Sequence, residues 1–327
     1  MYMIRVAVIG AGSWGRNIIR VLHELDALAA VYDIDAQVRE ECQRRYPDIP
    51  VYDNIHTILE NTTISAIMLA TPSPEHYKTA RCALLAGKDV YIEKPMALHA
   101  SEGEELVSLA GKNGCILMVG HLLHYHPAVI ALKELLSSGK LGDLRYIHAQ
   151  RLNFGKFRTG ENVLWSFAPH DLSLALSLAG SPPSEVRCYG SASLSKEVAD
   201  TTFTHLIFSN KVHCYIYVSW LYPFKEQRFV VVGTKQMAVF DDRMKDKLVI
   251  YPYSVDFEEL LPNGKREEGT AIPVEQTEPL HAECVHFLEC IESRTTPFTD
   301  GQEGVQVLKV LDACQHSLET GTPVTLR

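Results

Sequence analysis

The sequence predicts an α/β protein of two domains: first a doubly wound parallel sheet, then an α+β domain with a large, mostly antiparallel open sheet. Three observations predict it. Up to about residue 120, short apolar or β-branched runs alternate with amphipathic stretches of helical length, as buried parallel strands alternate with crossover helices. From about Ser184, strand-like runs follow one another directly. The C-terminal stretch then returns to the period of amphipathic helices.

The expected elements of the first domain, residues 1–121, alternate regularly. Five short runs have the composition of buried parallel strands: IRVAVIG, LAAVYD, SAIMLAT, DVYIE and CILMVG. The stretches between them that have helical period are 14–26, 35–46, 74–86 and 100–113. This spacing is typical of a Rossmann-type domain, in which ligands bind outside the carboxyl ends of the strands.

The second domain, residues 122–327, begins with a helical stretch at 126–139 and a strand-like run at 144–154. Six further strand-like runs follow the next helix: EVRCYGSAS, TFTHLIFS, VHCYIYVSWL, RFVVVG, MAVFDD and KLVIYPY. The tripeptides SNK and GTK fit tight hairpin connections between them. Two closing helices are expected at 279–293 and 301–321.

Composition excludes several classes of protein. The 327 residues are 46% hydrophobic and 22% charged, as in soluble globular proteins with room for two cores. A net charge of -9 argues against a surface for nucleic acid or an anionic membrane. The eight cysteines are scattered, without CxxC pairs or zinc-like Cys/His spacing, so we expect no metal and a reducing compartment. Since neither a signal peptide nor a membrane span is evident, we expect a cytoplasmic protein.

The stretch VAVIGAGSWGRN carries glycines in the GxGxxG spacing, directly after the first strand and at the start of a helix. Gly10 would form the tight turn, Gly12 would admit a pyrophosphate, and Gly15 would allow close packing of helix on strand. The pyrophosphate would rest on amides at the positive end of the helix. The loop residues that we assign to cofactor binding are Gly10, Gly12, Ser13, Trp14 and Gly15.

Asp33 ends the second strand, about 20 positions further on, where an acidic residue would bind a ribose 2′-hydroxyl. Its carboxylate would repel a 2′-phosphate, so we expect NAD rather than NADP. The alternative is an ordinary glycine-rich turn with Asp33 as a helix cap, but Asp35 is the better candidate for that cap.

Three more strand ends meet the expected cofactor crevice. One is Thr71-Pro72 with His76 early in the next helix, a second is Glu93-Lys94-Pro95, and a third is followed by His121. A lysine between a strand end and a proline has a restricted backbone, so its ammonium could be held over the nicotinamide; alone, it would more simply be a surface lysine beside a turn. The further residues that we assign to cofactor binding are Thr71, Pro72, His76, Glu93, Lys94 and His121.

The stretch NVLWSFAPHDLSLALSLAG, residues 162–180, reads as a loop that runs into a helix, with His170 and Asp171 at the junction. Alone, His170 is better explained as part of a capped helix than as a catalytic residue. Asp171 is expected in the first helical turn, where the helix dipole favours a carboxylate.

These motifs together resemble the glucose–fructose oxidoreductase, inositol dehydrogenase and rhizopine-catabolism (Gfo/Idh/MocA) family. The matching stretches, in order, are VIGAGSWG, Asp33, ATPSPEH, YIEKPMA and His170. The resemblance implies a Rossmann domain followed by an α/β domain whose open sheet mediates homodimers or homotetramers. It implies reversible hydride transfer between a sugar or polyol carbon and NAD(P), with Lys94 and His170 as the active-site lysine and histidine. No metal is required, because the nicotinamide carries the hydride.

The chemistry suits these two residues. Histidine titrates near neutrality, so His170 could take the hydroxyl proton and return it. Lys94, with an ordinary pKa of about 10.4, is better suited to donate a hydrogen bond to the oxygen and stabilise its developing charge. One departure from the family pattern stands at Ser166, where many relatives carry an aspartate four residues before the histidine.

The stretches GHLLHYHPAV (120–129) and RLNFGKFRTGENVLWSFAPHDLS (151–173) resemble a branch that oxidises the C3 hydroxyl of UDP-N-acetylglucosamine-type sugars to a 3-keto sugar. The basic residues before the active-site stretch suit a sugar-nucleotide diphosphate, the asparagines suit sugar hydroxyls or an N-acetyl group, and the tryptophan suits ring stacking. With Lys94 and His170, the expected substrate contacts are Arg151, Asn153, Lys156, Arg158, Asn162 and Trp165. The alternative is a solvated basic loop with Trp165 as a core anchor.

Two alternatives remain open at this stage. The substrate could be a free sugar, inositol or another cyclic polyol. The protein could instead bind NAD(P) as a regulator without turnover, although a regulator would not need both Lys94 and His170. His121, His124 and His126 do not have the spacing of a zinc triad, and we expect His121 to border the cofactor.

Overall fold

The structure, a computed structural model, describes residues 4–155, 157–158, 160–256 and 263–326. Its sheets confirm the predicted fold class, with one parallel sheet of six strands and one mostly antiparallel sheet of ten. The chain divides into two compact units, Met1–Leu122 with Glu278–Lys309, and Leu123–Thr277 with Val310–Arg327. The sequence predicted two continuous domains, with residues 278–309 in the second. In the structure this segment belongs to the first unit, where helix α8 (Pro279–Ser293) packs against helix α1 (Gly15–Glu24).

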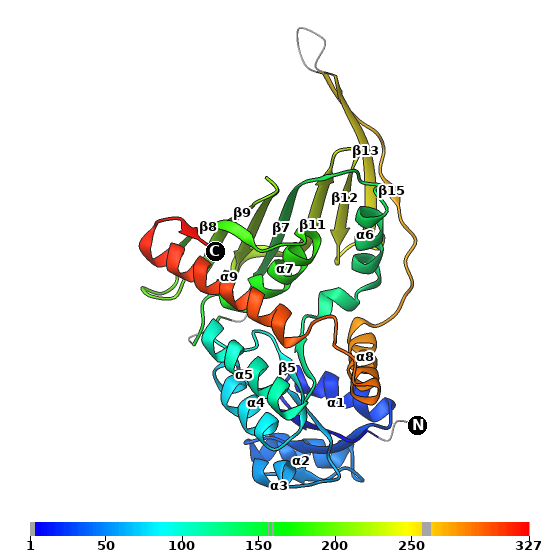
Figure 1. Ribbon diagram of the computed structural model, residues 1–327, viewed down its shortest axis with the longest axis vertical. Coiled ribbons are helices and arrows are strands. Elements are labelled where there is room, and N and C mark those ends of the chain that lie inside the picture. The colour runs from blue at the N-terminus through cyan, green and yellow to red at the C-terminus, as the bar shows by residue number, and fades with distance from the viewer. Residues whose placement is uncertain (1–3, 156, 159, 257–262, 327) are drawn as a thin grey trace. The chain divides into compact units, whose positions relative to one another are not determined.

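Unit 1 is built on the parallel sheet (Figure 1). Its strands are β1 (Val6–Ile9), β2 (Leu28–Tyr32), β3 (Val51–Tyr52), β4 (Ala66–Leu69), β5 (Asp89–Glu93) and β6 (Leu117–Gly120). Its helices are α1 (Gly15–Glu24), α2 (Ala36–Arg45), α3 (Ile55–Leu59), α4 (His76–Leu85), α5 (Ala100–Asn113), α8 (Pro279–Ser293) and the first part of α9 (Gly301–Thr320). The five predicted strands are confirmed. The sequence did not indicate β3 or α3, because two and five residues are too few to show a period.

The strand order β3-β2-β1-β4-β5-β6 decides where this unit can bind a ligand. The order reverses between β1 and β4, so the loops after these two strands diverge and leave a crevice at their carboxyl ends. Every residue of β1 and of β4 is buried, as expected for strands covered on both faces. The glycine loop follows β1, Thr71 lies just after β4, and Lys94 follows β5.

Unit 2 holds the ten-stranded sheet, in which only β7 and β10 pair in parallel. Its strands are β7 (Leu144–Phe154), β8 (Pro183–Ser191), β9 (Thr201–Phe208), β10 (His213–Ser219), β11 (Leu221–Gly233), β12 (Gln236–Asp241), β13 (Leu248–Asp256), β14 (Asn263–Arg266), β15 (Thr270–Ala271) and β16 (Val324–Thr325). SNK and GTK connect β9 to β10 and β11 to β12, as predicted. The short strands β14 to β16 were not expected. The unit also contains α6 (Pro127–Ser137) and α7 (Val163–Ala179), and α7 packs on β7, β9 and β10.

Helix α7 corrects one prediction. It begins at Val163, where the Asn162 side chain accepts hydrogen bonds from the amides of Leu164 and Trp165. His170 and Asp171 therefore lie in its third turn and not at a junction of loop and helix. The predicted junction at His170 and Asp171 was therefore wrong, although a proline such as Pro169 is common in the first turn of a helix. The proline instead lies inside the helix, where it removes a single backbone hydrogen bond.

Candidate active site

The glycine loop of unit 1 has the geometry of a phosphate cradle. Gly10 has φ of 95°, and a Cβ there would lie 2.9 Å from the backbone of Ala70 after β4. A Cβ on Gly15 would lie 1.9 Å from the Gly10 carbonyl oxygen. A Cβ on Gly12, by contrast, would meet nothing within 4 Å, so the backbone there faces open space. The loop thus fits a pyrophosphate held close to backbone amides at the start of α1.

Asp33 fixes the other side of this cradle. Its Oδ2 accepts a hydrogen bond of 2.7 Å from the Ala11 amide, and its Oδ1 accepts one of 2.9 Å from the Asp35 amide. A carboxylate can accept about four hydrogen bonds, so lone pairs remain for a ribose hydroxyl. The cap of α2 is Asp35, as predicted, because its side chain accepts from the amides of Gln37 and Val38. The residues present therefore fit a dinucleotide.

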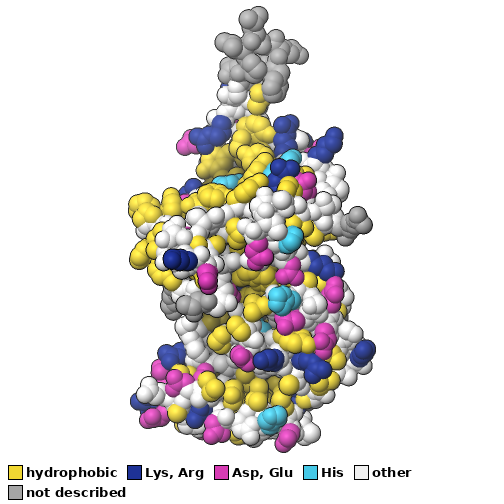
Figure 2. Space-filling view, turned by 90° about the vertical axis from the view of Figure 1, so that its left-hand side faces the viewer, with side chains coloured by type: hydrophobic (Ala, Val, Ile, Leu, Met, Phe, Trp, Pro, Cys, Tyr) yellow, Lys and Arg dark blue, Asp and Glu magenta, His cyan; other side chains and the backbone are white. Residues whose placement is uncertain are grey.

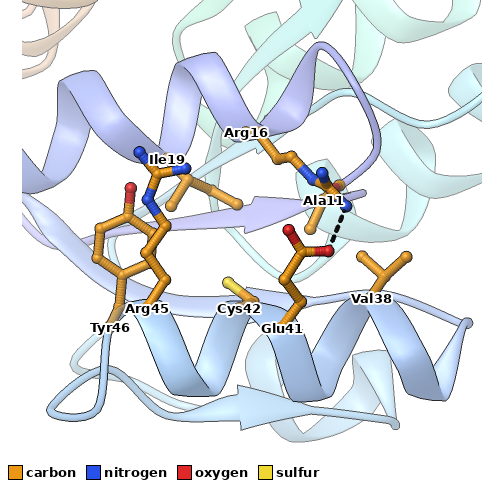
Figure 3. Close-up of a pocket in the computed structure, with 8 residues that line it drawn as sticks. All are labelled: Ala11, Arg16, Ile19, Val38, Glu41, Cys42, Arg45 and Tyr46. Carbon is orange, nitrogen blue, oxygen red and sulfur yellow. Dashed lines mark hydrogen bonds and ion pairs between the residues drawn. The ribbon is translucent and has the colours of Figure 1, made fainter.

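A small cavity lies beside this loop, between α1 and α2 (Figure 3). The Arg16–Glu41 ion pair of 2.8 Å crosses it, and burial raises the pKa of the Cys42 thiol within it. Its volume of about 20 Å³ suits one water molecule and not a nucleotide. Its lining residues are Ala11, Arg16, Ile19, Val38, Glu41, Cys42, Arg45 and Tyr46.

His76 connects the loops that follow β4 and β5. Its ring is 1% exposed, with Nδ1 2.8 Å from the Pro95 carbonyl oxygen and Nε2 2.8 Å from the Thr71 carbonyl oxygen. The histidine thus holds the two strand ends together through their backbones. Lys94, directly before Pro95, is half-buried, and the peptide bond between them is cis.

Glu93 joins the lysine loop to the glycine loop. Its Oε1 accepts a hydrogen bond of 2.5 Å from the indole of Trp14, and Trp14 lies between Gly12 and Gly15. Burial raises the pKa of Glu93, while the neighbouring Lys94 ammonium acts in the opposite direction. Pro72, at the same end of the sheet, is exposed, as is Ser13 of the glycine loop.

The histidines that follow β6 have hydrogen-bond partners within their own units. His121 is 1% exposed, and its Nδ1 lies 2.5 Å from Glu303 Oε2 in α9. His126 caps α6 by accepting from the Ala128 amide. Its other nitrogen lies 3.4 Å from Asp242, and this hydrogen bond lowers the pKa of that carboxyl. Across the described ranges, no three His, Cys, Asp or Glu side chains are grouped for a metal ion.

In unit 2, His170 and Asp171 face different surroundings. His170 is half-buried, with its Nδ1 in the interior. Asp171 is buried and accepts two hydrogen bonds from Arg151 of β7, at 2.9 and 3.0 Å. The prediction that Asp171 lies in a first helical turn, stabilised by the dipole, was wrong. Adjacent residues on a helix point about 100° apart, so Asp171 forms a buried ion pair while His170 faces another direction.

Ser166, where many relatives carry an aspartate, is 3% exposed and accepts a hydrogen bond of 3.2 Å from the Trp220 indole. It lies one turn before His170, on the same side of α7. A serine hydroxyl at this position satisfies a buried tryptophan at the end of β10 instead of presenting a charge to the histidine.

Several predicted substrate contacts have partners inside unit 2. Asn162 and Trp165 both donate to Oε1 of Gln315, at 2.9 and 3.1 Å, and Trp165 is 7% exposed. Arg158 is exposed and pairs with Glu161. Asn153 is half-buried near the end of β7. The predicted contact at Lys156 lies outside the described residues.

Sequence reasoning missed two hydrogen-bonded groups. In unit 2, His124 lies 2.8 Å from the Lys133 ammonium and 2.7 Å from the Ser173 hydroxyl. In unit 1, Tyr91 contacts both Glu93 and Glu283 of α8. Both groups join residues far apart in the chain. The only sequence signal was a polar residue within an apolar run, as at Tyr91 in DVYIE and Glu283 in LHAECVHF.

Comparison with known families decides the identity of this scaffold. Residues 4–121 match the model described as "Oxidoreductase family, NAD-binding Rossmann fold", and residues 129–239 match the "GFO/IDH/MocA C-terminal domain". The chain belongs to the Gfo/Idh/MocA family. The predicted family and the predicted cofactor, NAD, are thereby confirmed, and the protein is an oxidoreductase of this family.

Members of the Gfo/Idh/MocA family that resemble this chain differ in substrate. It is 28% identical to UDP-N-acetylglucosamine 3-dehydrogenase of Acidithiobacillus ferrooxidans, over 94% of this chain and 95% of that protein. A solved structure of that enzyme gives a TM-score of 0.84 at 26% identity and covers 97% of each chain. The chain is also 26% identical to scyllo-inositol 2-dehydrogenase (NADP(+)) of Bacillus subtilis, over 70% of this chain and 66% of that protein.

Proposed function

We propose that this oxidoreductase oxidises a secondary hydroxyl, at C3, of a UDP-N-acetylglucosamine-type nucleotide sugar to the 3-keto sugar. The observation that carries the proposal is the likeness to UDP-N-acetylglucosamine 3-dehydrogenase over almost the whole of both chains. The match to the inositol dehydrogenase leaves about a third of each protein uncovered. A likeness that covers both units from end to end is the better guide to the substrate.

The residues that would hold NAD are those of the cradle in unit 1. The amides of the glycine loop would bind the pyrophosphate, and Asp33 would accept from the adenosine ribose. When bound, NAD accepts the hydride that leaves the substrate carbon. His76 and Glu93 would act on this site indirectly, by holding the loops that carry Thr71, Trp14 and Lys94.

Lys94 and His170 would divide the remaining chemistry. Loss of a hydride from the C3 carbon must be accompanied by loss of the hydroxyl proton, and His170 would accept that proton. The Lys94 ammonium would donate a hydrogen bond to the same oxygen and stabilise its developing negative charge. In the reverse direction His170 would return the proton to the oxygen.

The observed partners narrow the set of substrate contacts. We retain Asn153 for sugar hydroxyls or the N-acetyl group and Arg158 for the diphosphate, because Asn153 is only half-buried and Arg158 is exposed. Arg151, Asn162 and Trp165 instead make hydrogen bonds within unit 2 that explain their residue types. Arg158→Ala should therefore raise KM for a UDP-sugar more than it lowers kcat.

The test is NAD reduction measured at 340 nm with a panel of UDP-sugars, free sugars and inositols. Turnover of UDP-N-acetylglucosamine or its uronic acid, without turnover of free sugars, supports the proposal. Preference for inositol or another free polyol would replace it with the alternative that the inositol dehydrogenase match favours. Binding of NADH without turnover of any of these compounds would indicate a cofactor-binding regulator.

We also propose that the protein is a homodimer or homotetramer that associates through the face of the ten-stranded sheet opposite α7. The aromatic side chains of Phe203, Tyr215 and Tyr146 on that face are exposed. Phe203 also stacks on the half-buried Tyr217, with ring centroids 4.2 Å apart. Figure 2 shows hydrophobic side chains gathered in the part of the molecule that holds this sheet. Sedimentation velocity tests the proposal: the wild type should be oligomeric and Phe203→Lys should be smaller.

The compartment remains a proposal as well. The structure describes all eight cysteines, each as a free thiol, and six of them are buried. Within the described residues no helix is long and apolar enough to cross a membrane. Free thiols fit the reducing cytoplasm that we propose.

A further inference from the structure

Three buried side chains of unit 1 form a hydrogen-bonded chain next to the cofactor loops. Tyr91 and Glu93 lie in β5 and Glu283 in α8. Their exposed fractions are 0%, 9% and 0%. The Tyr91 hydroxyl oxygen is 2.9 Å from Oε1 of Glu93 and 3.0 Å from Oε2 of Glu283. Two carboxyl groups therefore meet at one phenol.

The number of hydrogen atoms available among Tyr91, Glu93 and Glu283 determines which protonation states these three side chains can have together. A tyrosine hydroxyl has one hydrogen, and an ionised carboxylate can only accept. If both glutamates were ionised, Tyr91 could satisfy only one of them, and the other would place an uncompensated oxygen against the phenol oxygen. Both contacts are hydrogen bonds only when one glutamate carries a proton and donates it to Tyr91.

The surroundings decide which glutamate carries the proton. Glu93 Oε1 accepts a second hydrogen bond from the Trp14 indole, and the Lys94 ammonium is adjacent in the chain, so an ionised Glu93 is stabilised. Glu283 has no such support. Within the described residues its Oε1 is buried and has no hydrogen-bond partner. A neutral carboxylic acid tolerates such a position far better than a carboxylate does.

The electrostatics agree with this assignment. Burial raises the pKa of Glu283 well above its ordinary value, and the charge of Glu93 raises it further. Burial also raises the pKa of Glu93, but Lys94 and the hydrogen bonds from Trp14 and Tyr91 act against that rise. Their environments thus favour different protonation states for the two carboxyl groups: Glu283 keeps its proton, and Glu93 is ionised.

We propose that Glu283 is protonated at neutral pH and is a positioning residue for NAD binding. Its proton is donated to Tyr91, and Tyr91 then donates to Glu93. The Glu93 carboxylate in turn holds the Trp14 indole, between Gly12 and Gly15 of the cofactor loop, and lies directly before Lys94. This inference goes beyond the proposed function, because it concerns the cofactor loop and holds for any substrate.

Close packing holds the hydrogen-bonded side chains of Tyr91 and Glu93 in one conformation. Gly120 of β6 pairs with Glu93, and a Cβ there would lie 2.5 Å from the Tyr91 hydroxyl and 3.0 Å from Glu93 Oε1. The Tyr91 ring also packs edge-on against Phe287 of α8, with centroids 5.9 Å apart. No side chain larger than hydrogen fits at residue 120 without displacing the phenol.

The proposal implies a pH dependence. Within the described residues, the titratable groups that interact with Glu283 are Tyr91, Glu93 and the neighbouring Cys284 of α8. Lys94 after β5 acts on Glu93, and the ion pair of Glu278 with Arg20 of α1 acts on Cys284. When Glu283 ionises at alkaline pH, two carboxylates compete for the single Tyr91 proton. Glu93 then shares its hydrogen bond from Tyr91, the Trp14 indole is held less firmly, and NADH binds more weakly.

The experiment uses the full chain, with NADH as the probe, over a range from neutral to alkaline pH. NADH affinity is measured by energy transfer from tryptophan, with Trp14→Phe as the reference for the Trp14 signal. Infrared difference spectra report the C=O stretch of a buried protonated carboxyl group. The matched variants are Glu283→Gln, which can still donate to Tyr91, and Glu283→Met, which has similar size but cannot. Tyr91→Phe removes the hydroxyl group that links Glu283 to Glu93.

We expect Glu283→Gln to bind NADH within about twofold of the wild type at neutral pH and to lose the additional weakening at alkaline pH. Glu283→Met and Tyr91→Phe should weaken NADH binding about 3- to 10-fold. Tyr91→Phe removes the hydrogen bond to the Glu93 carboxylate, and Glu283→Met removes the donor that orients the Tyr91 hydroxyl toward Glu93. The protonated carboxyl band should disappear in Glu283→Gln and persist in Glu93→Gln.

Three results would overturn the proposal: a carboxyl band that persists in Glu283→Gln, equal loss of affinity in Glu283→Gln and Glu283→Met, or the same alkaline weakening in wild type and Glu283→Gln. Circular dichroism checks folding; if Glu283→Met and Tyr91→Phe do not fold, the infrared and pH results for Glu283→Gln decide alone. Normal NADH binding without sugar turnover would refute the proposed function and leave this inference standing.

Discussion

The two units place their candidate residues in contrasting ways. In unit 1 these residues lie in loops at the carboxyl ends of β1, β4 and β5, where short motifs fix their positions. In unit 2 the candidate histidine lies in the third turn of α7, among residues that pack against the ten-stranded sheet. A short loop motif is enough to indicate the function of its residues. Neighbouring residues on a helix face different surroundings, so only the packing of the helix shows which of them can take part in chemistry.

Two buried acidic residues show the same contrast. Asp171 in unit 2 is paired with the bidentate guanidinium of Arg151, while Glu283 in unit 1 has only a tyrosine hydroxyl within reach among the described residues. The first arrangement suits a charged carboxylate, and the second suits a neutral acid. Burial alone therefore does not assign a role to an acidic residue; its partner does.

The largest expected effect is on stability, from Asp171→Ala. This change leaves the buried guanidinium of Arg151 without its carboxylate and should lower the free energy of unfolding by about 3–5 kcal/mol. Urea denaturation measures it. The double variant Arg151→Met with Asp171→Leu should recover most of the loss, and Glu104→Ala, which breaks the exposed pair with Lys309, should cost less than about 1 kcal/mol. If Asp171→Ala were as stable as the wild type yet inactive, Asp171 would belong to the chemistry.

The second effect is on turnover. Lys94→Ala and His170→Ala should each lower kcat at least about 100-fold, the range usual for acid–base groups. His170→Ala should still bind NADH, because His170 is not among the residues assigned to the cofactor. Near-normal turnover in His170→Ala would remove unit 2 from the proton transfer and leave the chemistry to unit 1.

A smaller effect is expected on cofactor affinity. Asp33→Ala removes the acceptor for the Ala11 amide and for the ribose, and should raise the Kd for NADH about 10-fold. Asp35→Ala is the matched control, because it removes the cap of α2 but leaves Asp33 in place. It should cost about 1 kcal/mol of stability without changing NADH affinity. Fluorescence titration would refute the role of Asp33 if both variants bound NADH equally well.

The smallest effect concerns His148 of β7. Burial, followed by the charge of Arg228, lowers the pKa of this imidazole in the folded protein. The unfolded chain therefore binds more protons as the pH falls below about 6.5, and stability decreases in that direction. Thermal unfolding of His148→Gln should show a shallower acid-side decline, by about 1 kcal/mol or less. An unchanged pH profile would contradict it. Burial lowers the pKa of His205 and His286 as well, so part of the decline should remain.

Much of unit 1 could be predicted from the sequence. Its five longer strands, the cap at Asp35 and the glycine loop all follow from local rules: strand composition, capping chemistry and the absence of a side chain where backbones meet. The start of α7 could not be read in the same way, because Pro169 carries a strong local signal for a helix start that the packing of the helix overrides. Strands of two residues, such as β3 and β16, have no sequence signal at all.

The sequence by itself determined the fold class, the family and the cofactor, since each depends on residue types at fixed short spacing. Only the tertiary structure decided which polar groups share a proton or a charge: Glu283 with Tyr91, Asp171 with Arg151, and Ser166 with Trp220. These partners lie 20 to 192 residues apart in the chain. Chain folding brings them within hydrogen-bond distance, and no local pattern of residues encodes that proximity.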